Sequence, residues 1–257
     1  MIPFEKYEAT GNDFIMLDFF EFDWIDLDDG QLIKELCDRH FGIGADGLIA
    51  LCPDTDSDFK MLYFNSDGRK SSFCGNGSRA SLKYMHAKHA KAAFGFTAED
   101  GPHIGRIDDA LVSVKMRDIL AYESVRQGVV IQSGSPHLVV EVSDPWTYPV
   151  NEKGRLLRHE FDPDGVNVNF IHRQVDQLRI ATYERGVEWE TLACGTGVTA
   201  AAYYSAIQDG IDGERTISVQ AKGGSLTVRM NLDGKSATEV WLTGPARKVF
   251  SGFYELS

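Results

Sequence analysis

A short phrase built on cysteine occurs twice in the chain, as Cys-Gly-Asn-Gly-Ser at 74–78 and as Cys-Gly-Thr-Gly at 194–197. Each phrase runs into a stretch of helical composition, which predicts a thiol at the N-terminus of a helix. There the free backbone N–H groups and the helix dipole stabilise a thiolate and can also hold an anion. Two matched thiols, Cys74 and Cys194, suit a reaction that removes a proton from one face of a carbon and returns one to the opposite face.

The similarity between the two halves extends well beyond the cysteines. Each cysteine is preceded by an apolar, strand-like run with a polar turn and is followed by a helical stretch. These segments are 61–68 and 79–92 in the first half, and 178–186 and 198–208 in the second. Further upstream, 11–18 resembles 134–141, so order and spacing, at about 120 residues, agree between the halves. Two copies of one fold are therefore expected.

Strands outnumber helices in the remaining pattern. Alternating apolar residues predict strands at 112–116, 125–132, 225–230 and 239–244, and helical periodicity predicts helices at 29–40 and 151–157. Together these elements indicate an α+β protein. We expect each half to be a curved, mostly antiparallel β-sheet or barrel around the central helix that follows its cysteine, with a boundary near 117–121.

Composition narrows the classes of function. The chain has 38 acidic and 26 basic side chains and a net charge of −12, which disfavours nucleic acid or an anionic membrane as a partner. No uninterrupted apolar run approaches the roughly 20 residues of a bilayer span. Charged residues interrupt 1–22, which therefore lacks the apolar core of an export signal. We expect a soluble protein with free thiols in the reducing cytoplasm.

The other two cysteines fall on apolar patterns. Cys37 and Cys52 are expected in the core. The spacing of Cys37 and His40 suits a metal, but no second pair of ligands completes a zinc site. The glycines at 42, 44 and 47 spell a dinucleotide fingerprint, yet a helical rather than a strand-like segment precedes them. Neither a metal nor an organic cofactor is expected.

Further motifs accompany the two cysteine phrases. They are Gly-Asn-Asp-Phe at 11–14, Arg-His-Phe-Gly-Ile-Gly-Ala-Asp-Gly at 39–47, Phe-Asn-Ser-Asp-Gly at 64–68, Tyr-Glu-Arg-Gly at 183–186 and Gly-Gly-Ser-Leu at 223–226. With these motifs the chain resembles the diaminopimelate epimerase family nearly from end to end. The resemblance implies a cofactor-independent epimerase that interconverts LL- and meso-2,6-diaminopimelate in lysine and peptidoglycan-precursor synthesis. It also implies two pseudo-symmetric domains that close over a small amino-acid substrate, 1–117 with a returning segment 250–257, and 118–249.

The resemblance also implies roles for individual residues. Cys74 and Cys194 match the acid/base pair. Substrate contacts are implied for Asn12, Asn65, Gly75, Asn76, Asn167, Glu184, Arg185, Gly195 and Thr196, and support of the thiols for His137 and Glu184. Ser135 stands where the family often has asparagine. Two helix N-termini aimed at one carboxylate would place backbone donors where negative charge develops, in the role that pyridoxal phosphate has in other enzymes.

Alternatives stay open for both the residues and the function. Arg185 could be a surface partner of Glu184 or Glu188, Asn12 and Asn65 could be plain turn residues, and His137 could belong to the core. The nearest rival function is an isomerase of the proline or hydroxyproline racemase type, whose members typically have histidine at the position of Asn76. A thiol redox protein that cycles a Cys74–Cys194 disulfide belongs to another class, as does an amino-acid-binding module, which would not need both cysteines. The sequence leaves homodimer formation open.

Overall fold

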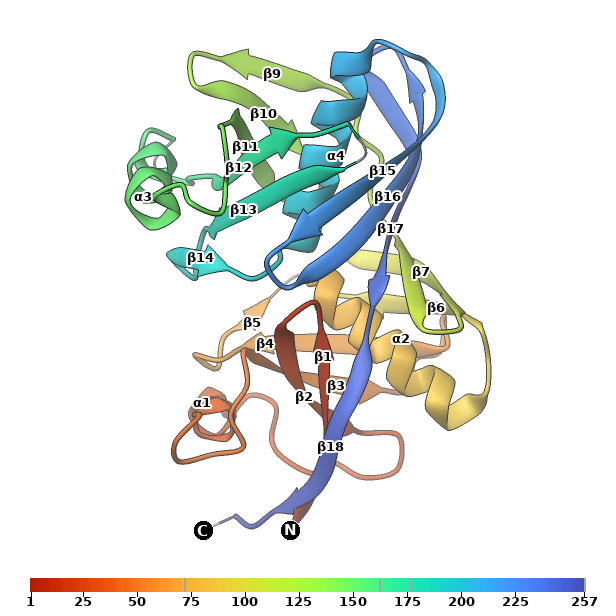
Figure 1. The fold of residues 1–257 in the computed structure, drawn as a ribbon. Coiled ribbons are helices and arrows are strands. Elements are labelled where there is room, and N and C mark those ends of the chain that lie inside the picture. Colours follow the sequence, from red (N-terminus) through yellow and green to blue (C-terminus); the bar gives the residue numbers. More distant parts are fainter. Residues whose placement is uncertain (72, 162, 176, 257) are drawn as a thin grey trace. The chain divides into compact units, whose positions relative to one another are not determined.

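The computed structural model describes residues 1–256 except 72, 162 and 176. Ser257, the last residue of the returning segment expected at 250–257, lies outside the described residues. The chain forms two compact units (Figure 1). The first comprises Met1–Val114 and Pro245–Ser257, and the second comprises Lys115–Gly244. Within the described part of the chain, no helix is long and apolar enough to cross a membrane.

The first unit is a mixed sheet around one helix. Its strands are β1 (Ile2–Ala9), β2 (Asn12–Asp18), β3 (Gly47–Cys52), β4 (Phe59–Asn65), β5 (Lys70–Ser71), β6 (Ala93–Ala98), β7 (Gly101–Asp108), β8 (Leu111–Lys115) and β18 (Arg247–Tyr254), and its helices are α1 (Gly30–Cys37) and α2 (Gly75–His89). β1 pairs antiparallel with both β2 and β18, so the C-terminal strand returns to the N-terminal one (Figure 1). β2 is parallel to β3, β3 antiparallel to β4, β4 parallel to β6, and β6, β7 and β8 form an antiparallel meander.

The second unit repeats this order. Its strands are β9 (Tyr122–Val125), β10 (Gly128–Gln132), β11 (Pro136–Glu141), β12 (Asn167–Arg173), β13 (Leu178–Glu184), β14 (Trp189–Thr191), β15 (Gly213–Ala221), β16 (Gly224–Asp233) and β17 (Ser236–Pro245), and its helices are α3 (Val150–His159) and α4 (Gly195–Asp209). β9, β10 and β11 are antiparallel, β11 is parallel to β12, β12 antiparallel to β13, and β13 parallel to β15. β15, β16 and β17 complete the unit as an antiparallel meander. The match between the units confirms the predicted α+β, pseudo-symmetric architecture.

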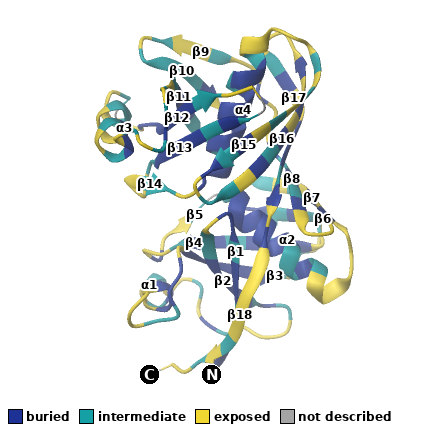
Figure 2. Cartoon of the chain, in the orientation of Figure 1, coloured by how far each residue is buried: buried dark blue, intermediate teal, exposed yellow. Residues whose placement is uncertain are grey.

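The two cysteine-led helices are the cores of their units. Figure 2 colours most of α4 and the N-terminal half of α2 as buried. α4 presents small apolar side chains on all sides, including Ala200, Ala201 and Ala202, as expected of a helix enclosed by strands. On β7, Gly105 lets α2 approach closely, because a Cβ there would lie 2.2 Å from Leu82 Cδ1. Close-packed sheets therefore fix the direction in which each helix N-terminus points.

Element boundaries differ from the expected ones in two informative places. The stretch 125–132 is not one strand but the end of β9, a turn and β10, with Val125 paired to Gly128 across the hairpin. The helix expected at 29–40 ends at Cys37, because the Asp38 carboxylate accepts the N–H groups of His40 and Phe41, both at 2.8 Å, and turns the chain. Cys37 is buried and Cys52 half-buried in the same apolar cluster, which confirms their core role.

Candidate active site

Cys74 is the N-cap residue of α2. Its extended backbone precedes the helix directly, and its Sγ accepts a hydrogen bond from the Gly77 N–H at 3.3 Å. Gly77 itself lies close to the thiol, since a Cβ there would be 3.5 Å from Sγ. The sulfur is thus held against the amide end of a helix of 15 residues, the environment that favours a thiolate.

Two asparagines accompany Cys74. Asn12 Oδ1, at the start of β2, lies 3.9 Å from Cys74 Sγ and accepts a hydrogen bond from Asn76 Nδ2 at 3.3 Å. Asn12 Nδ2 donates to Asp46 Oδ2 at 2.8 Å, so both ends of its amide are engaged. Asn65 is the last residue of β4; its backbone N–H donates to the Arg69 carbonyl and its carbonyl accepts the Gly68 N–H, both at 2.9 Å. The structure brings Asn12 and Asn76 to the thiol and places Asn65 at a strand end in the same unit.

Ion pairs fix the two carboxylates next to Asn12, those of Asp13 and Asp46. The Arg39 guanidinium donates two hydrogen bonds to Asp13, at 3.0 and 2.7 Å, and one to Asp46 at 2.7 Å. The buried ammonium of Lys6 adds an ion pair to Asp13 at 2.9 Å. Burial alone would raise the pKa of Asp13, but the hydrogen bonds from Arg39 and Lys6 outweigh it and hold that pKa well below its usual range. Arg39 and Asp46 of the motif at 39–47 therefore fix the start of β2, where Asn12 lies.

Cys194 is the N-cap residue of α4 and is almost fully buried. Its Sγ lies 3.4 Å from the hydroxyl of Thr196, in the first turn of the helix. The same hydroxyl lies 2.9 Å from His137 Nε2 and 3.2 Å from Ser135 Oγ. Ser135 Oγ is itself 2.9 Å from His137 Nε2. Ser135 thus belongs to this cluster of hydroxyls around a single imidazole nitrogen.

His137 is fully buried, and burial lowers its pKa to about 3. The imidazole is therefore neutral at ordinary pH. Asn169 Nδ2 donates to His137 Nδ1 at 2.9 Å, while Thr182 donates to Asn169 Oδ1 at 2.9 Å. This arrangement assigns the ring proton to Nε2, which faces Thr196. Sequence reasoning missed Asn169, although the two-residue alternation along a strand puts it on the same face as Asn167.

Asn167 and Arg185 lie next to this cluster, in the same unit, and are hydrogen-bonded to each other. Asn167 Nδ2 donates to Ser135 Oγ and to the Pro136 carbonyl, both at 3.2 Å, and its Oδ1 accepts the Arg185 N–H at 2.9 Å. The Arg185 guanidinium donates to the carbonyls of Asp164 at 2.9 Å and Gly165 at 3.4 Å. These contacts tie the loop before β12 to the end of β13.

Glu184 is the one acidic residue among the predicted site residues. Its Oε2 accepts a hydrogen bond from Thr191 Oγ1 at 2.9 Å, which links β13 to β14, the strand that leads to Cys194. Glu188, the other acid near Arg185, pairs instead with Arg158 at 3.2 Å. Among the residues described, no three His, Cys, Asp or Glu side chains are grouped so that they could hold a metal ion.

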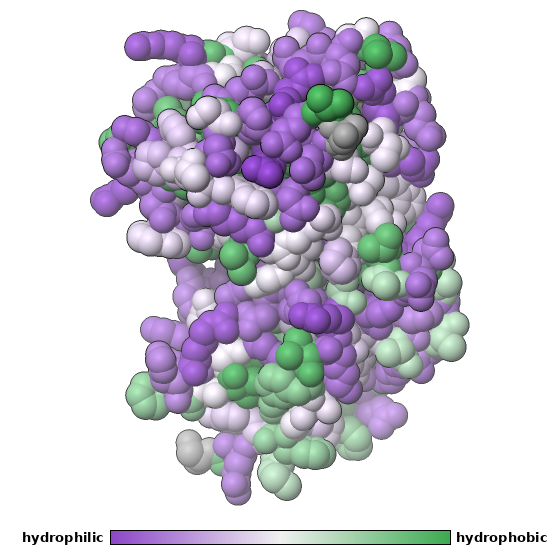
Figure 3. All heavy atoms as spheres, viewed as in Figure 1, coloured by the Kyte–Doolittle hydropathy of each residue, from purple (hydrophilic) through white to green (hydrophobic). Residues whose placement is uncertain are grey.

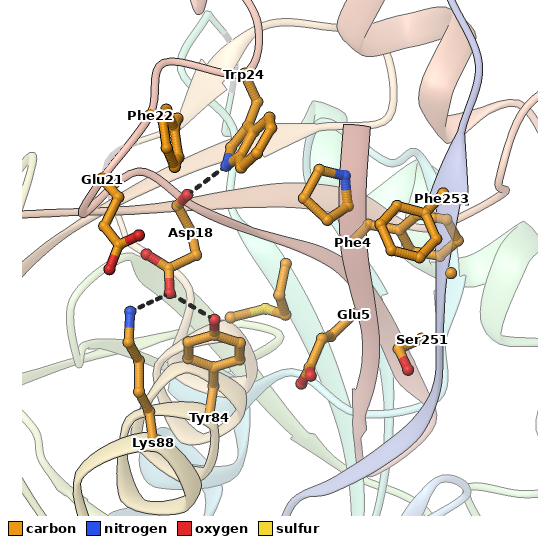
Figure 4. A pocket seen from close by; sticks show the side chains of 13 residues that line it. Phe4, Glu5, Asp18, Glu21, Phe22, Trp24, Tyr84, Lys88, Ser251 and Phe253 are labelled. Carbon is orange, nitrogen blue, oxygen red and sulfur yellow. Dashed lines mark hydrogen bonds and ion pairs between the residues drawn. The ribbon is translucent and has the colours of Figure 1, made fainter. Parts of the chain in front are cut away.

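A separate cavity of about 500 Å³ lies in the first unit, between β1, β2, β18 and α2. Figure 4 shows the Tyr84 hydroxyl and the Lys88 ammonium both reaching Asp18, with Trp24 above them. Tyr84 donates to Asp18 at 2.7 Å. The lining residues lie outside the predicted site. Three of them contact Asp18: Tyr84 and Lys88 at its carboxylate, and Trp24 at its backbone carbonyl.

Solved structures with low sequence identity share this fold. A phenazine biosynthesis protein of the PhzF family from Bacillus anthracis matches with a TM-score of 0.77 and 14% identity, covering 98% of this chain and 99% of that chain. A probable proline racemase from Agrobacterium radiobacter matches with a TM-score of 0.75 and 14% identity, covering 100% and 94%. The protein is thus of the two-domain fold class common to PhzF proteins and proline racemases.

Closer relatives identify the family. The model of the family described as diaminopimelate epimerase matches residues 4–109 and 129–249. A diaminopimelate epimerase from Flavobacterium psychrophilum is 39% identical over 250 residues, covering 95% of this chain and 97% of the relative. One from Nitratiruptor sp. is 35% identical over 257 residues, covering 97% of each. The chain belongs to the diaminopimelate epimerase family.

Proposed function

We propose that the protein interconverts LL- and meso-2,6-diaminopimelate without an organic cofactor, in lysine and peptidoglycan-precursor biosynthesis. The observation that carries the proposal is the placement of Cys74 and Cys194 as N-cap residues of equivalent helices in two units of one topology. Relatives named diaminopimelate epimerase support the choice of substrate, because they align with nearly the whole chain.

The proposed chemistry is a proton exchange at one carbon. One cysteine, as thiolate, takes the α-proton and becomes a thiol, while the other thiol gives its proton to the opposite face and becomes a thiolate. The reverse direction exchanges the two roles. The α-carboxylate would accept hydrogen bonds from the backbone N–H groups of Gly75, Asn76, Gly195 and Thr196 as carbanion charge spreads onto it. The mechanism requires both thiols to act on opposite faces of the same α-carbon.

The polar residues around each thiol would then bind the rest of the substrate. We assign Asn12 and Asn76, together with Asn65, to contacts made by the first unit. We assign Asn167, Glu184, Arg185 and Thr196 to contacts made by the second unit. Arg185 suits the distal carboxylate, since a guanidinium can bind a carboxylate through two parallel hydrogen bonds. His137 and Glu184 would support the thiols rather than touch the reacting carbon.

A substrate panel tests the proposal against its nearest rivals. Reduced protein is incubated with LL-diaminopimelate, L-proline or trans-4-hydroxy-L-proline, and stereoisomers are resolved by chiral chromatography. We expect only meso-diaminopimelate to form, and we expect hydroxylamine, which traps pyridoxal phosphate, to leave the rate unchanged. Epimerisation of either proline substrate would favour the racemase alternative. Dithiol oxidation without any epimerisation would favour the redox alternative.

Two further properties belong to the proposal. The mechanism needs reduced thiols, and the reducing cytoplasm keeps thiols in that state, which supports a cytoplasmic location. Homodimer formation is supported by β18, which pairs with β1 and whose Val249, Phe250 and Phe253 are exposed. Figure 3 shows apolar side chains gathered over this part of the first unit. Light scattering would detect a dimer, and the Phe250→Lys substitution should dissociate it. A monomeric parent protein would contradict the proposed homodimer.

A further inference from the structure

Arg79, in the second turn of α2, is fully buried, yet its hydrogen-bond acceptors are all neutral. Its Nη2 donates to Thr10 Oγ1 and to Asn76 Oδ1, both at 2.9 Å, and its Nη1 donates to the Gly75 carbonyl at 3.4 Å. Its Nε is buried without a hydrogen bond. Burial of a charged group among neutral partners costs free energy of folding. The presence of the Arg79 guanidinium at this position therefore requires an explanation.

The guanidinium keeps its charge at ordinary pH. Burial lowers the pKa of Arg79 to about 10, and the nearby Cys74 thiolate and Glu8 carboxylate oppose that effect. The Glu8 carboxylate is already engaged by the Gly11 N–H at 3.0 Å and by Arg247 of β18 at 2.6 Å. The positive charge of Arg79 therefore acts on Cys74 through a low-dielectric interior.

The equivalent place in the second unit carries no charge. Five residues after Cys194 stands Thr199, whose hydroxyl donates to the Gly195 carbonyl at 2.9 Å. The Cys194 thiol lies 3.4 Å from the Thr196 hydroxyl, which in turn contacts the neutral imidazole of His137. The two units agree in topology but differ in electrostatics at the residue that follows each cysteine by five.

We propose that Arg79 is a positioning residue that favours the thiolate on Cys74 over the thiolate on Cys194 and that holds Asn76 beside Asn12. The proposal rests on the proposed function, in which one cysteine is a thiolate and the other a thiol. It assigns the resting thiolate to Cys74. Among the described residues of the first unit, the charged groups that face this helix end include Glu8 from β1, paired with Arg247, and Asp46, which accepts from Asn12 and pairs with Arg39.

The test is site-resolved alkylation, which needs no substrate. Iodoacetamide is added at a series of pH values between 5 and 10, and mass spectrometry quantifies the modified Cys74 and Cys194 peptides. Because each profile is normalised to its own plateau, unequal access to the two thiols does not affect its midpoint. In the parent protein we expect the midpoint of Cys74 to lie below that of Cys194.

Variants separate charge from packing. Arg79→Met removes the charge, and we expect alkylation of Cys74 at pH 7 to slow by about tenfold, as a change of one pH unit in its midpoint would produce. Arg79→Lys keeps the charge and should restore most of the rate. The Cys194 profile should not move in either variant, nor in Thr199→Val, the matched change on α4. Circular dichroism melting shows whether each variant is folded.

Coincident Cys74 and Cys194 profiles in the parent protein would overturn the proposal, even if Arg79→Met failed to fold. An unchanged Cys74 profile in folded Arg79→Met would overturn it as well. Equal slowing in Arg79→Met and Arg79→Lys would assign Arg79 to packing alone and contradict the charge argument. Failure of the proposed function would instead appear in the substrate panel, whatever the alkylation profiles show.

Discussion

The Nε2 of His137 lies 2.9 Å from Thr196 Oγ1, and that hydroxyl lies 3.4 Å from Cys194 Sγ. Because Asn169 donates to Nδ1, the Nε2 proton is available to Thr196, whose own hydrogen can then turn to the sulfur. A neutral imidazole thus orients a hydroxyl donor towards the thiol of the second unit, whereas the first unit sets a buried cation behind its thiol.

Loss of the Thr196 hydroxyl should slow the reaction. Thr196→Val keeps the shape of the side chain but removes the donor to Cys194, and we expect kcat to fall by roughly tenfold or more, as for a hydrogen bond to a charged group. Thr196→Ser, which retains the hydroxyl, is the control. Kinetics measured from both LL- and meso-diaminopimelate check this, and equal kcat values in Thr196→Val and the parent protein would contradict it.

His137 should make the protein less stable in acid. Its pKa falls from 6.5 to about 3 on burial, so between these values the unfolded chain binds a proton that the folded protein does not. The stabilisation is complete above pH 6.5 and is lost as the pH falls towards 3, on the order of 2 kcal/mol of it by pH 5. Melting temperatures at pH 7 and pH 5 should therefore differ less in His137→Asn than in the parent protein. An identical pH dependence in both would show that the imidazole is not held neutral.

Alanine should be tolerated less well at Gly197 than at Gly77. A Cβ at Gly197 would lie 2.4 Å from Asn169 Oδ1 and 3.3 Å from His137 Cε1, so the amide that orients His137 would have to move. At Gly77 the nearest atom is Ile49 Cδ1 at 2.9 Å, the mobile end of a side chain. We expect Gly197→Ala to cost about 1–3 kcal/mol of stability and most of the activity, and Gly77→Ala much less. Chemical unfolding and kinetics measure both effects. A larger loss of stability and activity in Gly77→Ala than in Gly197→Ala would contradict the packing argument.

Arg185 is expected to bind the distal carboxylate as well as its own loop. Arg185→Ala should lower kcat/KM by roughly 100-fold, mostly through KM, because two charge-assisted hydrogen bonds are lost. Arg229→Ala, which removes an exposed partner of Glu214, is a matched control and should be neutral. A lower melting temperature with unchanged kinetics would show that Arg185 serves only the carbonyls of Asp164 and Gly165.

Much of the fold could be predicted because its signals are local or repeated. Alternation marked most strands, and the two cysteine phrases marked the starts of α2 and α4. The hairpin between β9 and β10 was not predicted, because Arg126 and Gln127 are polar residues that fit a strand face as well as a turn. The end of α1 was also predicted wrongly, because it depends on the Asp38 side chain rather than on a glycine or proline.

Tertiary contacts of the candidate site were harder to predict. Asn169 alternates with apolar residues along β12, and its importance comes from hydrogen bonds with His137 and Thr182 on neighbouring strands. Arg79 looks like an ordinary helix residue until its burial is known. The function of the Arg39 motif likewise depends on Asp13 and Asp46 being brought together by the parallel pairing of β2 and β3.

Proton exchange with solvent tests the two-cysteine mechanism most directly. Reduced protein is incubated with LL-diaminopimelate in D₂O, and the product is analysed by mass spectrometry and NMR. We expect meso-diaminopimelate with one deuterium at the inverted α-carbon, formed by the parent protein and by neither Cys74→Ala nor Cys194→Ala. Cys→Ser variants should be slower by orders of magnitude, because an alcohol is a far weaker acid than a thiol. Epimerisation by either alanine variant, or a product without deuterium, would contradict the mechanism.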